Sequence, residues 1–467
     1  MRNEAAREVE GEEGEEGEGV RSSERAIRTQ KHPESRQPVQ VRMKTFLLVN
    51  PWIHDFAAFD FWLKPLGLMR IAALLREAGH EVVLLDMLDR NHPWLRVHSK
   101  TDSWGRGKFH SEEIEKPCVL ERVPRRFKRY GIPKPAVRER LAEMPDADAV
   151  LLTSGMTYWY TGVRETVEVL KERYPETNFL LGGIYASLMP EHSKANAGVD
   201  HVIPGAMPGI CEALGKALDV DLKWKDLPPL WELYATLDYA VMTTTEGCPM
   251  RCTYCGSQLL KKGFSARDPE AVCEEIDYLA GLGVRRIVFY DDALLFNPEF
   301  DDLMKRLAGM GLELHTPNGL HVTMMNAAKA QAMRRAGFRS LYLSLESVDE
   351  SLLDSTGAKL TVGAFVKAVE HLKDAGFGAD ELHSYILFGL RNQSEDSVKR
   401  TVELALRLGV KPHLAEFSPV PGTQEYERSG LFFMDDPLLT NNTAWTSIQG
   451  MLESLERLKQ SLKMKEF

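Results

Sequence analysis

The chain has 467 residues, of which 43% are apolar and 27% charged, and its formal net charge is −10. This length supports more than one core, so we expect two folded domains. The acidic balance argues against a general nucleic-acid binder, which needs a basic face for phosphate contacts. No run approaches the roughly 18 apolar residues of a membrane span, and the start lacks the layout of a secretory signal. We therefore expect a cytoplasmic protein with a small or medium-sized substrate and no membrane or nucleic-acid partner.

Residues 1–42 are rich in Glu, Gly, Arg and Ser and contain few large apolar side chains. Such a segment cannot offset the entropy of ordering, so we expect an acidic and basic tail that is disordered. Met43 directly precedes an apolar strand, which makes it a candidate start of translation. Mass spectrometry of the native N-terminus would reject this hypothesis by finding peptides from residues 1–42.

Residues 43–220 alternate between the strand and the helix period, which predicts an α/β fold with a parallel, doubly wound, Rossmann-like sheet. An interruption at about 90–145 has two interpretations, a solvated insertion with charged helices or a lid over the domain junction. As a lid, its basic run (Arg122, Arg125, Arg126, Lys128 and Arg129) could meet an anionic substrate. The expected strands are 46–49, 81–85, 149–153, 179–181 and 199–203, and the expected helices 66–78 and 164–174.

After a Pro-containing linker at 221–238, a second alternating series covers residues 239–430. Six strand–helix repeats predict a partial (β/α)6 version of the TIM-type barrel, whose ligands lie at the carboxyl ends of the strands. Residues 431–467 are expected to be a helical extension that ends in an amphipathic helix, 448–462, packed against the barrel. The expected strands are 239–244, 286–290, 313–316, 340–345, 383–388 and 413–417, with helices beginning near Pro269, Pro298, Met324, Val362 and Ser394.

Three of the six cysteines, Cys248, Cys252 and Cys255, form a CxxxCxxC triplet directly after the first barrel strand. Three thiolates on one short loop can hold three corners of a cubane iron–sulfur cluster. A zinc ribbon is the competing interpretation, but structural zinc needs four ligands and usually a second pair of cysteines. Three ligands with a vacant fourth position indicate a catalytic metal.

This spacing, with Tyr254 before the third cysteine and a barrel behind it, resembles the radical S-adenosylmethionine (SAM) superfamily. The resemblance implies a 4Fe–4S cluster whose open iron binds SAM. One electron, from a donor such as flavodoxin or ferredoxin, then cleaves SAM to methionine and a 5′-deoxyadenosyl radical. A non-enzymatic alternative is an iron–sulfur protein that senses iron or redox state.

The same resemblance implies SAM contacts at the strand ends. An acidic residue after the second strand could bind the amino group, and Glu346 lies in a Ser344–Ser347 segment similar to the family's G-x-E-S element. As an alternative, Glu346 is a helix N-cap or a salt-bridge residue of the barrel rim. Arg391 and Asn392 replace the Pro and Gly of the family's usual Gly-Leu-Pro-Gly. The candidate SAM contacts are Tyr254, Gly256, Asp291, Asp292, Asn318, Ser344 and Glu346, with His321 beside them.

A doubly wound domain before such a barrel resembles the cobalamin (B12)-binding class of the superfamily. There is no Asp-x-His-x-x-Gly motif, so the cobalamin that the resemblance implies should lack histidine ligation. The alternative is a Rossmann-like domain without the cofactor. The candidate cobalamin contacts are Pro65, Leu66, Ser154, Gly155, Thr157, Gly182, Gly183 and Gly205.

With cobalamin, the simplest reaction is methyl transfer to the substrate. Ring formation or oxidative rearrangement, with or without cobalamin, is the alternative within the superfamily. The cofactors would carry the chemistry while the protein orients them. Neither the substrate nor a catalytic residue follows from the sequence.

Overall fold

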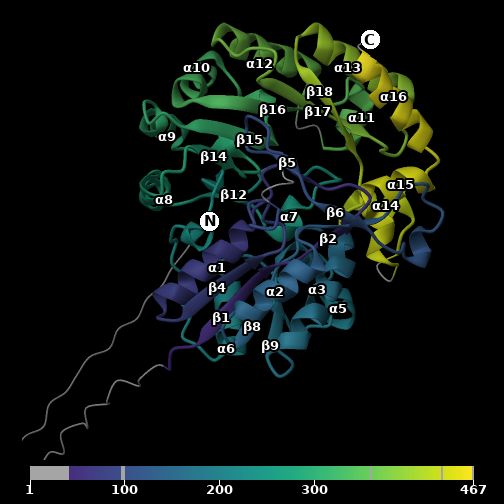
Figure 1. Ribbon diagram of the computed structural model, residues 1–467. Coiled ribbons are helices and arrows are strands. Elements are labelled where there is room, and N and C mark those ends of the chain that lie inside the picture. The colour runs from purple at the N-terminus through teal and green to yellow at the C-terminus, as the bar shows by residue number, and fades with distance from the viewer. Residues whose placement is uncertain (1–41, 96–99, 358–359, 433–434, 465–467) are drawn as a thin grey trace, which may run out of the picture. The chain divides into compact units, whose positions relative to one another are not determined.

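Two parallel β-sheets organise the residues that the computed structural model describes, namely 42–95, 100–357, 360–432 and 435–464 (Figure 1). The expected disorder of the N-terminal tail falls on residues 1–41, outside the described part. Residues 43–467 form one compact unit that contains both sheets. The first sheet has the order β10–β9–β8–β1–β4, with β1 Thr45–Asn50, β4 Glu81–Asp86, β8 Ala149–Leu152, β9 Asn178–Leu181 and β10 His201–Val202.

Helices cover both faces of the first sheet. Along β1, Phe46 and Leu48 pack into one apolar cluster with α1 and α6, whereas Leu47 and Val49 pack into a second cluster with α2 and α3. Burial on both faces explains why these strands are apolar throughout. The predicted doubly wound, Rossmann-like sheet is confirmed. Its helices are α1 Leu66–Glu77, α2 Lys134–Glu143, α3 Tyr160–Arg173, α4 Gly183–Leu188, α5 Pro190–Asn196 and α6 Ile210–Leu218.

The insertion is only in part the solvated, charged helical segment that we considered: α2, with Arg138 and Arg140 exposed, fits that description, whereas the residues before α2 do not. It contributes short antiparallel strands, and its apolar side chains, such as Leu120, Phe127 and Ile132, are buried in the core of the first domain. This burial results from strand pairing with residues far away in the sequence, which the local charge pattern cannot predict. The pairs join β2 Ile53–Asp55, β6 Ser111–Glu113 and β7 Lys128–Tyr130 into one sheet and β3 Phe59–Asp60 to β5 Gly107–Lys108.

The basic run of the insertion pairs with carboxylates of this chain. Arg125 contacts Glu456 at 2.8 Å, and Arg126 contacts Glu113 at 3.4 Å. Arg129 lies 3.0 Å from Glu165. Arg129 is therefore engaged within the protein, whereas Arg126 stays largely exposed, so the role of the basic run toward an anionic substrate stays a prediction.

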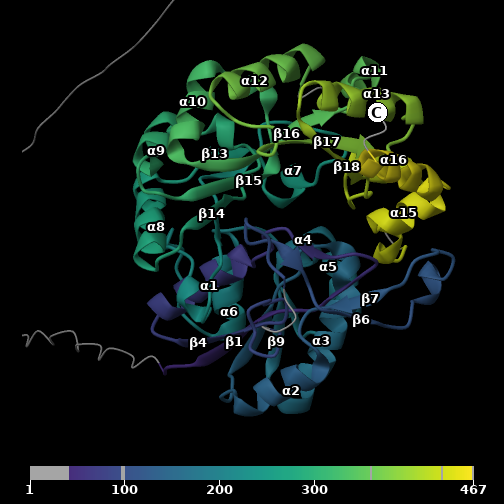
Figure 2. The same cartoon turned by 45° about the horizontal axis from the view of Figure 1, so that its top comes forward.

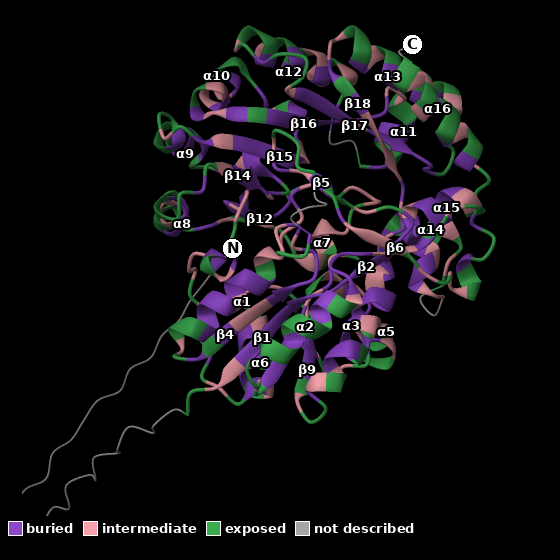
Figure 3. Ribbon diagram, in the orientation of Figure 1, coloured by how far each residue is buried: buried purple, intermediate pink, exposed green. Residues whose placement is uncertain are grey.

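The second sheet is the predicted six-stranded half-barrel. Its strands pair in chain order, all parallel, and the helices between them lie on the outer side of the sheet (Figures 1 and 2). The strands of this sheet are coloured largely as buried in Figure 3, and their apolar side chains pack against these helices. The strands are β11 Ala240–Met242, β14 Arg286–Phe289, β15 Glu313–Leu320, β16 Phe338–Glu346, β17 Leu382–Phe388 and β18 Lys411–Glu416, and the helices α8 Pro269–Gly281, α9 Phe300–Leu307, α10 Ala327–Ala336, α12 Val362–Asp374 and α13 Glu395–Arg407.

Side-chain caps fix where four of these helices begin. Asp268, Asn326, Thr361 and Ser394 each accept a hydrogen bond from a backbone N–H in the first turn of the following helix. Such caps satisfy donors that have no partner inside the helix. Because a cap is a local signal, the expected helix starts agree with the structure.

Aromatic and histidine side chains fill the inside of the half-barrel near the amino ends of its strands. Tyr342 of β16 stacks on His383 of β17, with ring centroids 4.4 Å apart. From the insertion, Arg106 donates a hydrogen bond to the Tyr342 hydroxyl at 3.1 Å, and the Trp104 ring lies 5.7 Å from that of His315. Burial lowers the pKa of His315 and of His383 to about 3, so both rings are neutral at pH 7. The insertion therefore closes the end of the barrel opposite the expected ligand side.

The described part of the C-terminal extension is largely helical, as expected, but its last helix begins at Leu452 and not at 448. α15 (Asn442–Ile448) ends before Gly450, whose φ of +68° breaks the helical path, and α16 (Leu452–Met464) follows. Asn441 donates a hydrogen bond to Asp55 at 2.9 Å, so the extension contacts the first domain and not only the barrel. Within the described residues, no helix combines the length and apolar character needed to cross a membrane.

Candidate functional site

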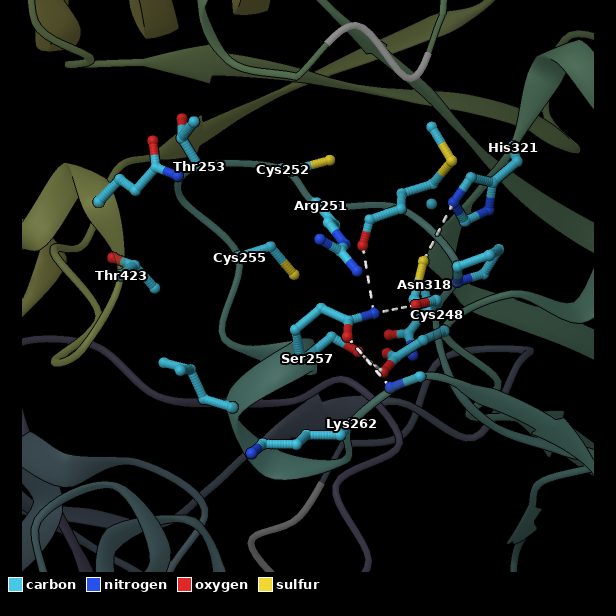
Figure 4. A pocket seen from close by; sticks show the side chains of 18 of the residues that line it. Cys248, Arg251, Cys252, Thr253, Cys255, Ser257, Lys262, Asn318, His321 and Thr423 are labelled. Atoms are coloured by element: carbon cyan, nitrogen blue, oxygen red, sulfur yellow. Dashed lines mark hydrogen bonds between the residues drawn. The ribbon is translucent and has the colours of Figure 1, made fainter.

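The cysteine loop, residues 248–256, lies on the wall of a cavity of about 760 Å³, which we call the cluster cavity (Figure 4). The loop follows β12 (Thr245–Gly247) and is followed by α7 (Ser257–Leu260) and then by β13 (Phe264–Ala266), which pairs antiparallel with β12. All three cysteines of the triplet line the cavity, as do Asn318 and Gly319 of β15 and Tyr385 of β17. The cavity thus lies beside the half-barrel strands, where the barrel architecture predicts a ligand site.

Gln258 braces the first turn of the cysteine loop. Its side-chain amide donates hydrogen bonds to the backbone oxygens of Cys248 and, at 3.3 Å, Met250. Its side-chain oxygen accepts from the backbone N–H of Gly263 at 3.1 Å. One amide therefore fixes both ends of the segment that carries the first cysteine. We did not single out Gln258, because nothing in the sequence distinguishes it from another polar residue of a loop.

The second turn of the loop is held by two other loops of the barrel. Thr253 donates its backbone N–H to the Thr356 carbonyl at 3.1 Å, and its hydroxyl donates to Glu425 at 3.1 Å. The backbone N–H of Glu425 donates to the Thr253 carbonyl at 3.1 Å. The loop is therefore fixed before any ligand binds, which lowers the entropy cost of holding three metal ligands.

The three thiols differ in burial. Cys248 is 8% exposed, Cys252 is half-buried and Cys255 is exposed. Burial raises the pKa of the Cys248 thiol, and its Sγ lies 3.5 Å from Nε2 of His321. Among the residues that the structure describes, no three His, Cys, Asp or Glu are grouped to hold a single ion. Three thiols on the wall of a large cavity are a donor set that fits an iron–sulfur cluster.

Two of the candidate SAM contacts line the cluster cavity. Asn318 donates a hydrogen bond to the Tyr290 carbonyl at 2.9 Å, which fixes its side chain at the edge of β15. Asp292 also lines the cavity, and Ser257 donates a hydrogen bond to its carboxylate. His321 lines the same wall, directly after β15. Their roles toward SAM stay predictions.

Asp291, next to Asp292, faces away from the cavity into a turn. Its Oδ1 accepts four hydrogen bonds of 2.6–2.9 Å, from the backbone N–H groups and hydroxyls of Thr244 and Thr245. Burial raises the pKa of this carboxyl. The geometry gives Asp291 a structural contact that ties the end of β14 to the start of β12, the strand before the cysteine loop.

The remaining SAM candidates do not line the cluster cavity. Ser344 is buried beside Gly319, and Glu346 is a buried residue at the end of β16 with a φ of +59°. Asp349 caps α11 (Glu350–Ser355), so the N-cap role that we considered for Glu346 is wrong. Of the other two candidates, Tyr254 packs against an apolar cluster of barrel residues and Trp445, and a Cβ at Gly256 would lie 3.0 Å from Val420.

The candidate cobalamin contacts lie at the carboxyl edge of the first sheet. The chain reverses its direction across the sheet between β1 and β8, and ligands of such folds bind at this switch point. A cavity of about 90 Å³ lies there and is lined by Pro65, Ser154 and Gly155, together with Trp159 and Lys64. Lys64 was not singled out from the sequence. Its ammonium lies 3.8 Å from Asp86 and 3.9 Å from the Tyr234 ring centroid.

A second cavity, of about 150 Å³, is lined by Gly182, Gly183 and Gly205, and we call it the glycine cavity. Its other walls are largely apolar, with Leu68 and Ile71 of α1 among them. A Cβ at Gly183 would lie 2.6 Å from the Thr153 hydroxyl and 2.8 Å from the Ser154 carbonyl. An apolar cavity of about this volume can hold a benzene ring in other proteins, so a single aromatic ring fits here.

Leu66 and Thr157, the other two cobalamin candidates, line neither of these two cavities. Leu66 is the first residue of α1, and Thr157 is buried at the start of a short 3-10 helix, Thr157–Trp159. Both follow strands of the first sheet closely in space, but the structure assigns them no ligand contact. Their role stays a prediction.

The two candidate cofactor regions adjoin each other. α4, which begins at Gly183, packs beside α7, which follows Cys255 in the chain. Gly183, the first residue of α4, also lines the glycine cavity. A ligand of the first domain and a ligand of the cysteine loop would therefore be neighbours.

Comparisons with known proteins agree with this geometry. Residues 242–405 match the model of the radical SAM superfamily. The chain is 29% identical over 209 residues to the "Uncharacterized methyltransferase PH0819" of Pyrococcus horikoshii, covering 43% of this chain and 44% of that protein. It is 28% identical over 208 residues to the GTP 3′,8-cyclase of Ectopseudomonas mendocina, and the match covers 43% of this chain and 60% of that protein. The chain thus spans about half the length of these curated relatives.

Among solved structures, the fold resembles TsrM from Kitasatospora setae, a radical SAM methyltransferase solved with tryptophan and a SAM analogue bound. The TM-score is 0.61 at 16% identity, over 83% of this chain and 76% of that one. TsrM has also been solved with cobalamin and a 4Fe–4S cluster bound, with a TM-score of 0.59. At this identity the likeness shows the fold alone. Residues 242–405 thus match the radical SAM superfamily, and the fold of the chain resembles that of a cobalamin-binding radical SAM enzyme.

Proposed function

We propose that this chain is a radical SAM enzyme that cleaves SAM at a 4Fe–4S cluster and performs a cobalamin-dependent methyl transfer to a small or medium-sized substrate. The observation that carries the proposal is the contact between α4 and α7, since it joins the glycine cavity to the cysteine loop. Methyl transfer with cobalamin requires both cofactors to reach one substrate. The methyltransferase name of one relative supports the same reaction.

The residues of the cluster cavity would have separate roles. Cys248, Cys252 and Cys255 would hold three irons, while the bound cluster supplies the electron that cleaves SAM. Asp292 offers a carboxylate to the SAM amino group, and Asn318 offers its side-chain oxygen, since its amide nitrogen is engaged with the Tyr290 carbonyl. The cavity volume of about 760 Å³ accommodates both the cluster and a ligand of ordinary size.

The first domain would hold the cobalamin without a histidine ligand, and the bound cofactor would act as the methyl carrier. The aromatic end group would occupy the glycine cavity, where the lack of side chains leaves the space that it needs. The edge with Ser154 and Gly155 would meet the corrin ring, beside the buried ammonium of Lys64. A small flavin or iron–sulfur protein would deliver the electron.

One experiment tests the proposal directly. The protein is purified anaerobically with iron, sulfide and hydroxocobalamin supplied, then reduced with dithionite in the presence of SAM. We expect cluster absorbance, about one cobalt per chain and formation of 5′-deoxyadenosine. A well-loaded cluster that never yields 5′-deoxyadenosine would overturn the enzyme and favour an iron–sulfur sensor. Cluster and SAM cleavage without bound cobalt would overturn the cobalamin part only.

Ring formation or oxidative rearrangement is a second candidate, favoured by the likeness to a GTP 3′,8-cyclase. In that reaction no methyl group enters the product. Incubation of candidate substrates with SAM labelled in its methyl group separates the two. Label in the product supports methyl transfer, and an unlabelled cyclised product supports the cyclase.

A further inference from the structure

His321 contacts the most buried of the three cluster cysteines. Its Nε2 lies 3.5 Å from Sγ of Cys248, and Figure 4 draws this contact across the wall of the cluster cavity. His321 is 4% exposed and Cys248 8% exposed. The two residues are 73 positions apart in the chain, so only the fold brings them together.

The imidazole ring is held in this orientation by its surroundings. The Phe296 ring meets it edge to face, with centroids 5.2 Å apart and an interplanar angle of 87°. The His321 carbonyl accepts a hydrogen bond from the backbone N–H of Met324 at 2.9 Å, which fixes the turn after β15. A ring fixed by packing and by its own backbone can direct one nitrogen at one sulfur.

A neutral imidazole that carries its proton on Nε2 can donate a strong hydrogen bond to a thiolate, whereas the sulfur of a protonated thiol is only a weak acceptor. An iron-bound Cys248 is a thiolate and therefore an acceptor. A hydrogen bond to a cluster sulfur stabilises the reduced cluster, which carries one more negative charge, more than the oxidised cluster. Cys248 is buried beside this donor, whereas the exposed Cys255 is open to hydrogen bonds from water.

We propose that His321 is a positioning residue that donates its Nε2 proton in a hydrogen bond to the Cys248 thiolate and raises the reduction potential of the cluster. This inference rests on the cluster of the proposed function. It concerns the potential at which the cluster accepts an electron, not whether the protein binds the cluster. The histidine holds a proton throughout, and no bond to it forms or breaks.

The test is a redox titration of the reconstituted cluster, followed by EPR of the reduced form without SAM. His321→Leu and His321→Met remove the donor and keep an apolar side chain of similar size, and His321→Gln keeps an N–H near Nε2. Phe296→Leu serves as the packing control, because it alters the neighbour of the ring but leaves the donor in place. Iron and sulfide analysis confirms equal loading before the titration.

At the wild-type midpoint, we expect the ratio of reduced to oxidised cluster in His321→Leu and His321→Met to fall by about tenfold, the effect of one charge-assisted hydrogen bond. His321→Gln should lie between these variants and wild type, and Phe296→Leu should match wild type. If either donor-less variant loads fully and keeps the wild-type midpoint, the inference is wrong. If the wild-type protein binds one zinc and no iron–sulfur cluster, the proposed function fails instead, with His321 as the fourth ligand.

Discussion

The cysteine loop and the glycine cavity differ in what makes each a candidate site. The loop presents three thiols, and side chains such as Gln258 and Thr253 fix its backbone by hydrogen bonds. The glycine cavity presents almost no functional group and is defined by missing side chains beneath a rigid sheet. One site therefore depends on which atoms are present, and the other on which atoms are absent. A substitution should damage the first by removing a ligand and the second by adding volume.

The largest effect should follow from removing a thiol. Cys252→Ala leaves two ligands on the loop, so we expect loss of cluster absorbance and of 5′-deoxyadenosine formation. Iron analysis after anaerobic reconstitution measures the first effect. Cys273→Ala is the matched control, since Cys273 lies on α8, is not among the residues that line the cluster cavity, and should leave iron content unchanged. A Cys252→Ala protein with full absorbance and SAM cleavage would remove the basis of the assignment.

The next largest effect should follow from filling the glycine cavity. Gly183 has a φ of +86°, and an added Cβ would press on the Ser154 carbonyl at 2.8 Å. We expect Gly183→Ala to cost about 3 kcal/mol of unfolding free energy and to abolish cobalt binding while leaving the iron content intact. Urea unfolding and cobalt analysis provide the two measurements.

Gly79→Ala separates strain from steric clash in this comparison. Gly79 has a φ of +84°, but nothing lies within 4 Å of an added Cβ. It should cost only about 1 kcal/mol and retain cobalt. Equal cobalt loading of the Gly183 and Gly79 variants would show that the glycine cavity holds no ligand.

A smaller effect should follow from weakening the contact between the two regions. Arg70 of α1 donates to the Thr243 hydroxyl at 2.7 Å and lies 3.5 Å from Glu246, two residues before Cys248. Arg70→Met should cost about 2 kcal/mol and lower cluster occupancy, because a buried partner of the loop is lost. Arg76→Met, which breaks an exposed pair with Glu232, should change stability by less than about 0.5 kcal/mol. If the two variants behaved alike, α1 would not support the cysteine loop.

The smallest effect concerns a polar network inside the first domain. Burial alone would raise the pKa of Glu165, but hydrogen bonds from His54 and Lys134 outweigh it and lower the pKa to about 2. A depressed carboxyl pKa adds stability that is present above the unfolded value of about 4.3 and is lost as pH falls towards 2. Glu165→Gln should therefore cost about 1 kcal/mol at pH 7 and nothing near pH 2. Urea midpoints across this range measure the difference, and a pH-independent difference would exclude the ion-pair origin.

The barrel shows how far local signals reach. Strands such as β14 and β17 contain short apolar runs, and caps such as Asp268 and Ser394 mark where helices begin. Both signals act over a few residues, so the expected elements agree with the observed ones. The cysteine triplet is equally local, since its three thiols lie within eight residues.

The insertion and the neighbouring residues Asp291 and Asp292 show what local sequence signals cannot predict. Strand pairing of residues 53–55 with 128–130 buries a segment whose charge predicted a solvated one. Asp291 and Asp292 are neighbours of the same type, yet one accepts from Thr244 and Thr245 and the other lines the cluster cavity. Both residues follow the end of β14, so the path of the loop after this strand decides which of the two side chains faces the cavity.

By itself, the sequence determined the order of the two sheets' strands and helices and the loop that carries the thiols, because periodicity, caps and ligand spacing are properties of short segments. The tertiary structure alone decided that the insertion closes the barrel, that α4 packs beside α7 and that His321 meets Cys248. These contacts join residues dozens to hundreds of positions apart. They form only when burial of apolar surface across the whole unit brings those segments together.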